Sequence, residues 1–199
     1  INDSLQSNQD TFMAIFGHAA AGAATYQTML FDDGDDNLSV WILGTGGNGS
    51  VTAKSNAQYR DVNGWYNIVW VSDTTNATAA DRWKFYINGV NLADVSQGGG
   101  FATNNIGSIS QNHEGFINSS SYEMTIGSQR SYNTDNGRYF DGYMSQCVMV
   151  DGQALDASYF GFEDPMTGVW RPKKFNIEDC PTADFGTNGF YLPMDGSGP

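Results

Sequence analysis

Short apolar segments with a two-residue period run along the whole chain, and clusters of Gly, Asn and Asp separate them. Successive side chains of a β-strand point to opposite faces, so this alternation indicates half-buried strands joined by turns. No window shows a sustained helical period, and only residues 156–160, capped by Asp156, predict one short helical turn. The pattern therefore predicts an all-β antiparallel fold, as a two-sheet β-sandwich or a barrel. The predicted strands are 11–16, 25–31, 38–43, 65–71, 82–87, 90–95, 122–126, 139–150 and 190–192.

The hairpin at residues 82–95 is the clearest local prediction. Its alternation places Arg82 and Lys84 on the face away from the core. The dipeptide Asn88-Gly89 suits a type I′ turn, because both residues tolerate positive φ. Three apolar side chains are expected to face the core: Trp83, Phe85 and Ile87.

Other segments set the expected organisation of the domain. Residues 65–71 are apolar on both faces, which is typical of a central strand. Residues 96–121 are rich in Asn, Ser and Gly and predict a long surface loop, and 133–137 predict a turn. We expect one sandwich domain over residues 1–192, with 193–199 as a linker or the start of a further segment.

The charge balance limits the partners that we expect. The formal net charge is −13, and the nine Lys and Arg residues are scattered. A nucleic-acid surface needs clustered basic residues, so no nucleic-acid partner is expected. No apolar run reaches the length of a membrane helix, so membrane insertion is not expected either.

Cys147 and Cys180 are the only cysteines of the chain. Two cysteines are too few for a disulfide scaffold or a structural zinc site. Cys147 lies within an apolar segment, and Cys180 precedes a proline. The sequence favours two free thiols over a bridge between them.

Several motifs occur in a specific order along the chain. Trp65-Tyr66 leads to an Asp-Thr-Thr loop at residues 73–75, and a Tyr-Ile-Asn-Gly run follows at 86–89. The later motifs are 139–150, Val-Asp-Gly-Gln-Ala-Leu at 150–155, Phe-Gly at 160–161, 167–173, and Gly-Thr-Asn-Gly-Phe-Tyr-Leu at 186–192. In this combination, residues 11–192 resemble the laminin-G/concanavalin A-like domains in structural proteins of tailed bacterial and marine viruses.

The resemblance implies an antiparallel two-sheet β-sandwich, a jelly roll with long loops. It also implies a non-enzymatic structural or interaction module on the surface of a virus particle, in a fibre, decoration or tail component. Expected partners are further copies of the chain and other virion proteins, and the family is compatible with contacts to host-surface glycans. Two alternatives stay open: a dedicated carbohydrate-binding lectin domain, and a glycoside hydrolase or lyase on the same fold.

Calcium is the one cofactor that the sequence suggests. The acidic run at residues 32–36 offers several carboxylate oxygens at one point, as hard cations require. The spacing differs from an EF-hand loop, and a solvated hairpin tip is the favoured alternative. The candidate calcium ligands are Asp32, Asp33, Asp35 and Asp36.

No catalytic residues are predicted. The four glutamates do not form the closely spaced motif of the β-glucanase relatives, and His18 and His113 lack a supporting motif. The glycine run at residues 44–49 matches a dinucleotide fingerprint, but no helix pattern follows it, so a hairpin loop is favoured. Ligand-binding residues stay unassigned, although tyrosines could supply a sugar-stacking surface. The tyrosines considered are Tyr26, Tyr59, Tyr66, Tyr122, Tyr132, Tyr139 and Tyr143.

Trp170 is expected to be a packing anchor rather than a ligand platform. It lies between the short turn at residues 156–160 and Pro172, where the chain is irregular. Such a segment needs an apolar partner to fix its course.

Overall fold

The computed structural model describes residues 12–19, 26–32, 36–43, 51–104, 109–114, 124–131 and 134–196. All of its described strand pairs are antiparallel, as the sequence predicted. The largest sheet has six strands in the order β8-β4-β3-β2-β1-β9. These strands are β1 (Phe12–Ala19), β2 (Tyr26–Asp32), β3 (Asn37–Leu43), β4 (Val51–Gln58), β8 (Phe101–Asn104) and β9 (Met124–Ile126).

Four smaller sheets complete the described strands. A three-stranded sheet holds β5 (Ile68–Ser72), β6 (Trp83–Ile87) and β7 (Val90–Asn91). The remaining sheets are pairs of strands. They are β10 (Ser128–Ser131) with β11 (Thr134–Tyr139), β12 (Cys147–Met149) with β15 (Phe190–Leu192), and β13 (Gly161–Glu163) with β14 (Trp170–Pro172).

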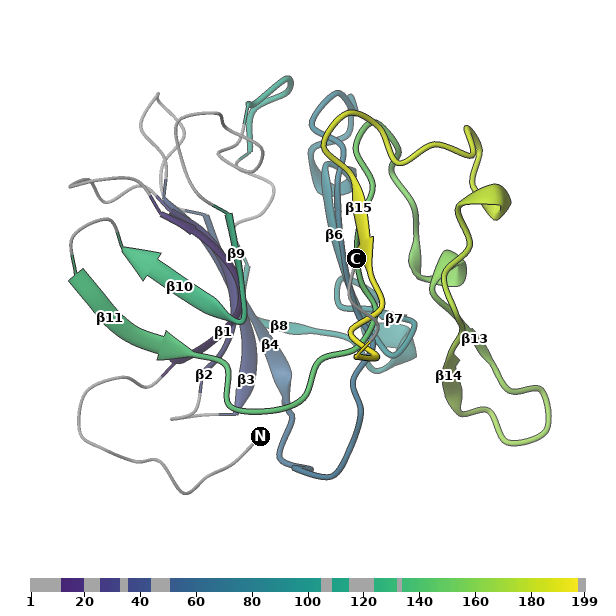
Figure 1. Ribbon diagram of the computed structural model, residues 1–199, viewed down its shortest axis with the longest axis horizontal. Coiled ribbons are helices and arrows are strands. Elements are labelled where there is room, and N and C mark those ends of the chain that lie inside the picture. The colour runs from purple at the N-terminus through teal and green to yellow at the C-terminus, as the bar shows by residue number, and fades with distance from the viewer. Residues whose placement is uncertain are drawn as a thin grey trace.

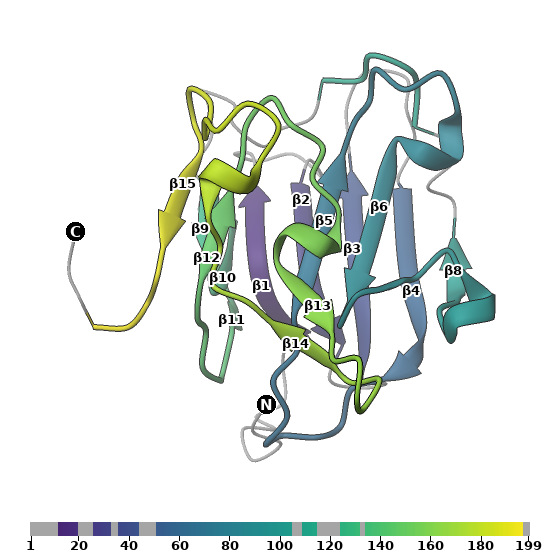
Figure 2. The same ribbon diagram turned by 90° about the vertical axis from the view of Figure 1, so that its right-hand side faces the viewer.

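The sheets are arranged in layers (Figures 1 and 2). The six-stranded sheet forms one layer, and β6 and β15 lie in a second layer that faces it. β5 and β12 belong to this second layer, because β5 pairs with β6 and β12 pairs with β15. The segment with β13 and β14 covers the outer side of this second layer. The main core lies between the two layers and is built from residues of both sheets. Its buried members are Met29, Leu38, Val40, Ala53, Trp83, Phe85, Ile87, Leu92 and Ile109.

The predicted hairpin register is confirmed. Trp83, Phe85 and Ile87 are buried, with Trp83 only 4% exposed, whereas Lys84 is partly exposed and forms an ion pair with Asp81 at 3.3 Å. Ile87 pairs with Val90, so Asn88 and Gly89 form the two-residue loop, with φ of 48° and 78°. Both values are positive, as a type I′ turn requires.

A second, smaller core lies on the outer side of β12 and β15. Its buried members are Leu155, Phe175 and Cys180. The rings of Phe160 and Phe175 stack there with centroids 5.2 Å apart. This core fixes residues 150–192 against the second layer.

Short 3₁₀ turns connect several of the strands. The predicted turn near Asp156 is present as η4 (Ala157–Tyr159), and the Asp156 carboxylate accepts a hydrogen bond of 2.8 Å from Ser158 N. Three further turns were not predicted: η1 (Ala79–Asp81), η2 (Val95–Gln97) and η5 (Ile177–Asp179). In the described part of the chain, no helix has the length and apolar character needed to cross a membrane.

Several strand predictions are wrong. Residues 139–150 do not form one strand, because Gln146 adopts a left-handed φ of 52° and only Cys147–Met149 are extended in β12. The segment 65–71 is not central in its sheet, since β5 pairs with β6 alone among the described strands. The expected turn at 133–137 lies largely within β11, and part of the expected loop 96–121 forms η2 and β8. The predicted strand 90–95 ends at Asn91.

Arg82 also departs from its predicted position. It is 8% exposed rather than on the solvent face, because its guanidinium donates to three backbone carbonyls. The acceptors are Asn76 O at 2.8 Å, Ile109 O at 2.5 Å and Ala77 O at 3.1 Å. A buried charge is tolerated when its donors are satisfied in this way, and Arg82 thereby ties two loops to the start of β6.

Candidate binding cleft

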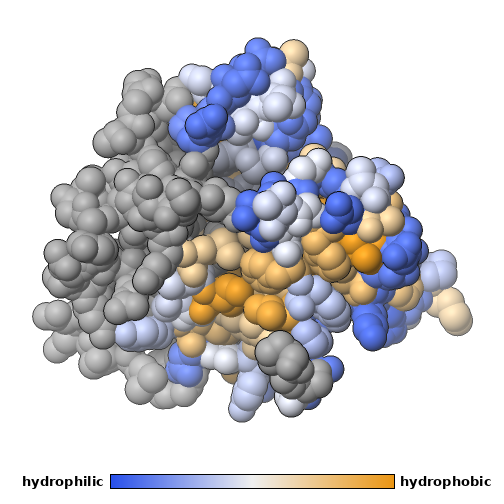
Figure 3. Space-filling model, turned by 45° about the horizontal axis from the view of Figure 1, so that its top comes forward, coloured by the Kyte–Doolittle hydropathy of each residue, from blue (hydrophilic) through white to orange (hydrophobic). Residues whose placement is uncertain are grey.

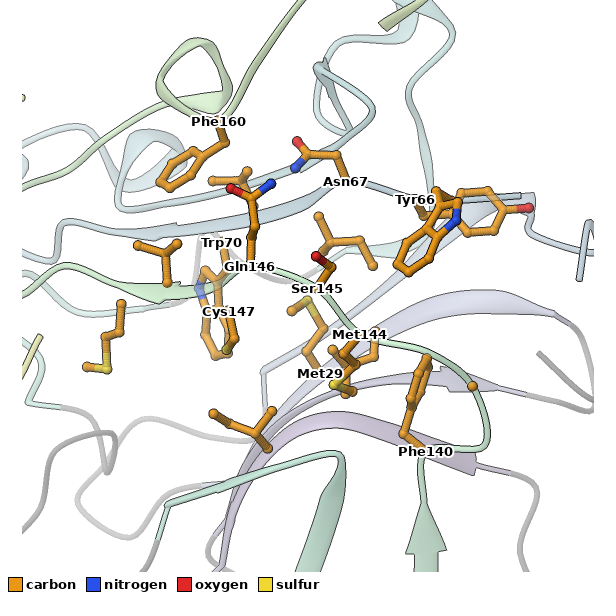
Figure 4. A pocket seen from close by; sticks show the side chains of 18 of the residues that line it. Met29, Tyr66, Asn67, Trp70, Phe140, Met144, Ser145, Gln146, Cys147 and Phe160 are labelled. Atoms are coloured by element: carbon orange, nitrogen blue, oxygen red, sulfur yellow. The ribbon is translucent and has the colours of Figure 1, made fainter. Parts of the chain in front are cut away.

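A large cavity opens between β5 and the segment that leads into β12, and we call it the β5–β12 cleft (Figure 4). Its volume is about 1180 Å³. Residues 62–72 line one side and residues 140–150 line the other. Ile15, Met29 and Ile126 of the six-stranded sheet also line the cavity. Pockets that bind small molecules are typically concave and mainly apolar with a few polar groups, as this one is.

Local backbone geometry explains why the cleft stays open. The left-handed conformation of Gln146 turns the chain just before β12, and Gln146 N donates to Pro193 O at 3.2 Å. As a result, β12 pairs with β15 along the edge that faces away from β5. β5 likewise pairs with β6 along the edge that faces away from β12, which leaves the cleft between β5 and β12.

The inner wall of the cleft is held by the main core. Trp70 of β5 packs edge-on against Trp83, with ring centroids 5.4 Å apart. Trp70 also contacts Phe85 with centroids 5.5 Å apart. These aromatic contacts fix the position of β5 and therefore the width of the cleft.

The rim of the cleft carries exposed aromatic side chains. Trp65 is 64% exposed and Tyr143 is 89% exposed, and both line the cavity. Val62 adds an exposed aliphatic side chain to the same rim. Exposed aromatic residues beside a cavity are suited to stacking on a ligand, because their apolar area is large and their rotamer entropy is low.

Two side-chain amides point into the cleft with their donors unused. The Asn67 oxygen accepts from Trp170 Nε1 at 3.3 Å, and the Gln146 oxygen accepts from Phe175 N at 3.0 Å and from Tyr191 Oη at 3.3 Å. Neither NH₂ group has a hydrogen-bond partner among the described residues. Figure 4 shows both amides on the same side of the cavity. The fold thus fixes the oxygens and presents two donors to a ligand acceptor.

Asp141 adds a negative group to the lining. Its Oδ2 atom is buried and has no hydrogen-bond partner in the described part of the chain. A buried oxygen without a partner is costly.

Cys147 also lines the cleft, and it is not bridged to Cys180. Both thiols are free, which confirms the interpretation that the sequence favoured. Burial raises the pKa of the Cys147 thiol, so it is protonated and a poor nucleophile near neutral pH. For Cys180, burial and then the neighbouring Asp179 raise the pKa.

Trp170 is a packing anchor, as predicted. Its six-membered ring lies over Gly89 of the β6–β7 turn and its indole nitrogen lies near Gly161 of β13. A Cβ at either glycine would fall within 2.6 Å of the ring. Through its hydrogen bond to Asn67, Trp170 also orients one amide of the cleft.

The predicted calcium ligands are only partly described. Asp36 is described, and its carboxylate accepts from Arg60 Nε at 2.5 Å in an ion pair. Asp32 ends β2, and nothing is described of its side chain. Asp33 and Asp35 lie outside the described residues. Within the described residues, no group of three or more His, Cys, Asp or Glu side chains is placed to hold a metal ion.

Most of the other candidate residues whose side chains are described lie outside the cleft. His18 lies in β1, and His113 lies in the segment 109–114. Glu163 and Glu178 are exposed on β13 and η5.

Of the seven tyrosines considered, Tyr66 and Tyr143 line the cavity, and Tyr59 and Tyr139 do not. Tyr122 and Tyr132 lie outside the described residues. The side chain of Tyr26 is not described. The glycine run 44–49 also lies outside the described residues, and strand β4 follows it.

No family model, curated protein or solved structure matches this chain. The geometry of the cleft therefore carries the functional argument. Asn67, Asp141 and Gln146 were not identified from the sequence as binding residues. Nothing in the sequence around Asn67 or Gln146 marks them, because the groups that fix the orientation of their amides are more than 25 residues away.

Proposed function

We propose that this chain is a non-enzymatic interaction module of a virus particle, built as a laminin-G-like two-sheet sandwich, and that it holds its ligand in the β5–β12 cleft. The observation that carries the proposal is the cleft itself. It combines an apolar lining, two exposed aromatic residues on the rim and two amide donors that have no partner among the described residues. A rigid β-core that presents such a site is suited to binding.

The resemblance to viral laminin-G-like domains supports the virion location. Its motifs, far apart in sequence, meet in space around one point. The Asn88-Gly89 turn, the Phe160-Gly161 step and Asn67, which follows Trp65-Tyr66, all contact Trp170. Mass spectrometry of virus particles purified from the source organism tests the location, and recovery of this chain with the major structural proteins is expected. Its absence from purified particles would contradict the proposal.

An exposed apolar hairpin supports assembly with other subunits. The β13–β14 hairpin presents Phe162, Met166 and Val169 to solvent. A separate band of apolar residues, bordered by polar ones, crosses the middle of the face shown in Figure 3. Exposed apolar patches often mark protein–protein contacts. Light scattering should show an oligomer that Val169→Lys dissociates, whereas Val95→Lys, at a more exposed site on η2, leaves it intact. A monomer at high concentration would contradict this part of the proposal.

A dedicated lectin is the second candidate. Trp65 and Tyr143 could stack on pyranose rings, and the amides of Asn67 and Gln146 could donate to sugar hydroxyls. A glycan-array screen tests this candidate directly. A hit that is lost in Tyr143→Ala and retained in Tyr139→Ala would favour the lectin, since Tyr139 is also exposed, at 56%, but lies outside the cleft.

Catalysis is tested separately from binding. The chain is incubated with labelled polysaccharides, and we expect no change in their length. Cleavage that a single Asp→Asn or Glu→Gln substitution abolishes would replace the proposed function with a hydrolase or lyase.

A further inference from the structure

The two strands that flank the cleft each lack a neighbour on the side facing it. In the described part of the chain, β5 is paired with β6 alone and β12 with β15 alone. Figure 2 places β15, β12, β5 and β6 in this order across one layer. The cleft therefore lies where a further strand of this layer would run.

The backbone of β5 is oriented for such a strand. Asn67 O accepts from Asn88 N at 2.8 Å, and Asp73 N donates to Arg82 O at 2.7 Å, so these residues are bonded toward β6. Backbone groups of an antiparallel strand alternate between its two sides. The N–H and C=O groups of Ile68 and Ser72 therefore point away from β6, toward the cleft.

We propose that the β5–β12 cleft binds an extended segment of a partner polypeptide, which adds a strand between β5 and β12. The inference rests on the proposed interaction function and specifies the class of partner. Addition of a strand to an exposed sheet edge is an established mode of peptide recognition. Open edges of this kind are a template for pairing with another chain.

The lining defines the chemistry of the partner segment. Ile15, Met29 and Ile126 require apolar side chains at alternate positions of the added strand. The NH₂ groups of Asn67 and Gln146 match peptide carbonyls, which are acceptors along the whole segment. Asp141, a partly exposed residue of the lining, favours one Lys or Arg. With a net charge of −13 on this chain, a neutral or basic partner is favoured over a second copy.

The length of the segment follows from β5. This strand has five residues, and an extended chain rises about 3.3 Å per residue, so the paired part spans roughly 17 Å. The probe is a synthetic peptide of about nine residues with valine at alternate positions, threonine between them and one lysine. A second peptide has glutamine in place of lysine. A third carries N-methyl groups on the backbone amides of alternate residues.

Binding is measured by calorimetry on the full chain, and the alkylation rate of Cys147 is followed in parallel. We expect the lysine peptide to bind and to protect Cys147, while Cys180 in the second core keeps its rate. N-methylation should weaken binding at least about tenfold, because it removes backbone hydrogen bonds to the sheet edge. Equal binding of the N-methylated peptide would overturn the inference, since only apolar contact would then be involved.

Three variants test the polar groups of the cleft. Gln146→Glu and Asn67→Asp keep the side-chain oxygen that accepts hydrogen bonds within the fold and remove the NH₂ donor. Each substitution should weaken binding of the glutamine peptide about tenfold. Asp141→Asn should abolish the preference for the lysine peptide over the glutamine peptide. Asn176→Asp, on the outer turn η5, is the control and should leave peptide binding unchanged. Unchanged binding in all three cleft variants would overturn the inference.

The outcomes separate the inference from the function on which it rests. If the peptides fail but a glycan binds and protects Cys147, the strand inference is wrong and the cleft is still a binding site. If neither a peptide nor a glycan protects Cys147, both the inference and the proposed cleft are contradicted.

Discussion

Trp170 lies directly on Gly89: a Cβ added to Gly89 would fall 2.2 Å from Cε3 of the indole ring. The two residues are 81 positions apart, and they join the β13–β14 hairpin to the turn between β6 and β7. Gly89 also has a φ of 78°, which L-residues with a side chain rarely adopt. The residue at position 89 must therefore tolerate a positive φ and must also lack a Cβ, and glycine satisfies both requirements.

Replacement of Gly89 by alanine should destabilise the protein by roughly 3 kcal/mol, the sum of a left-handed backbone penalty and a steric clash. Gly98→Ala is the matched control, because Gly98 has a φ of 83° and no atom within 4 Å of the added Cβ. Its cost should be only about 1–2 kcal/mol. Urea unfolding followed by tryptophan fluorescence measures both values, and equal losses would show that the Trp170 contact is absent.

Trp83 should dominate the stability of the main core. Trp83→Ala is expected to cost about 3–5 kcal/mol, the usual loss for a buried aromatic residue. Trp65→Ala removes the same side chain from an exposed site and should change stability by no more than about 0.5 kcal/mol. A similar loss in both variants would contradict the observed register of β6.

Arg82 should be far more important for stability than its charge suggests. Arg82→Met leaves one buried and two partly buried carbonyls without their donor, which should cost about 3 kcal/mol. Arg60→Met breaks an ion pair of an exposed side chain and should cost less than about 1 kcal/mol. Thermal unfolding of the two variants gives the comparison, and a loss at Arg82 as small as that at Arg60 would exclude the buried network.

Stability should fall at alkaline pH because of the buried thiols. Burial raises the pKa of Cys147 above its ordinary value of 9.0, so the unfolded chain ionises first as the pH rises. The contribution is complete below pH 9.0 and is lost between that value and the higher pKa of the folded state. Unfolding curves measured across this range should show a decline, and Cys147→Ala should reduce its slope. An unchanged slope would mean that the thiol is solvated.

The sequence predicted those parts of the fold that depend on local pattern. The β6–β7 hairpin follows from alternation and from Asn88-Gly89, and β15 was predicted with its observed bounds at 190–192. The predicted strand 139–150 failed because alternation does not reveal that Gln146 takes a left-handed conformation. Arg82 was misplaced because its three acceptors come from loops whose positions only the folded chain defines.

The cleft could not be predicted for a related reason. Its walls come from two segments, 62–72 and 140–150, that are 78 positions apart, and each amide is oriented by a distant partner. The orientation of the Asn67 amide depends on its hydrogen bond from Trp170, and that of the Gln146 amide depends on hydrogen bonds from Phe175 and Tyr191. Trp65 and Tyr143 were noted in the sequence, but alternation alone does not tell a rim residue from a core residue.

If the β5–β12 cleft holds the ligand, the side-chain amide signals of Asn67 and Gln146 will report it in a nuclear magnetic resonance titration. The titrant is the glycan or peptide that binds in the screens described above. Both NH₂ signals should shift in proportion to binding, while the NH₂ signal of Asn176, which is bonded to Asp179, stays in place. Binding that leaves the Asn67 and Gln146 signals unmoved, with shifts confined to the β13–β14 hairpin, would show that the ligand binds outside the cleft.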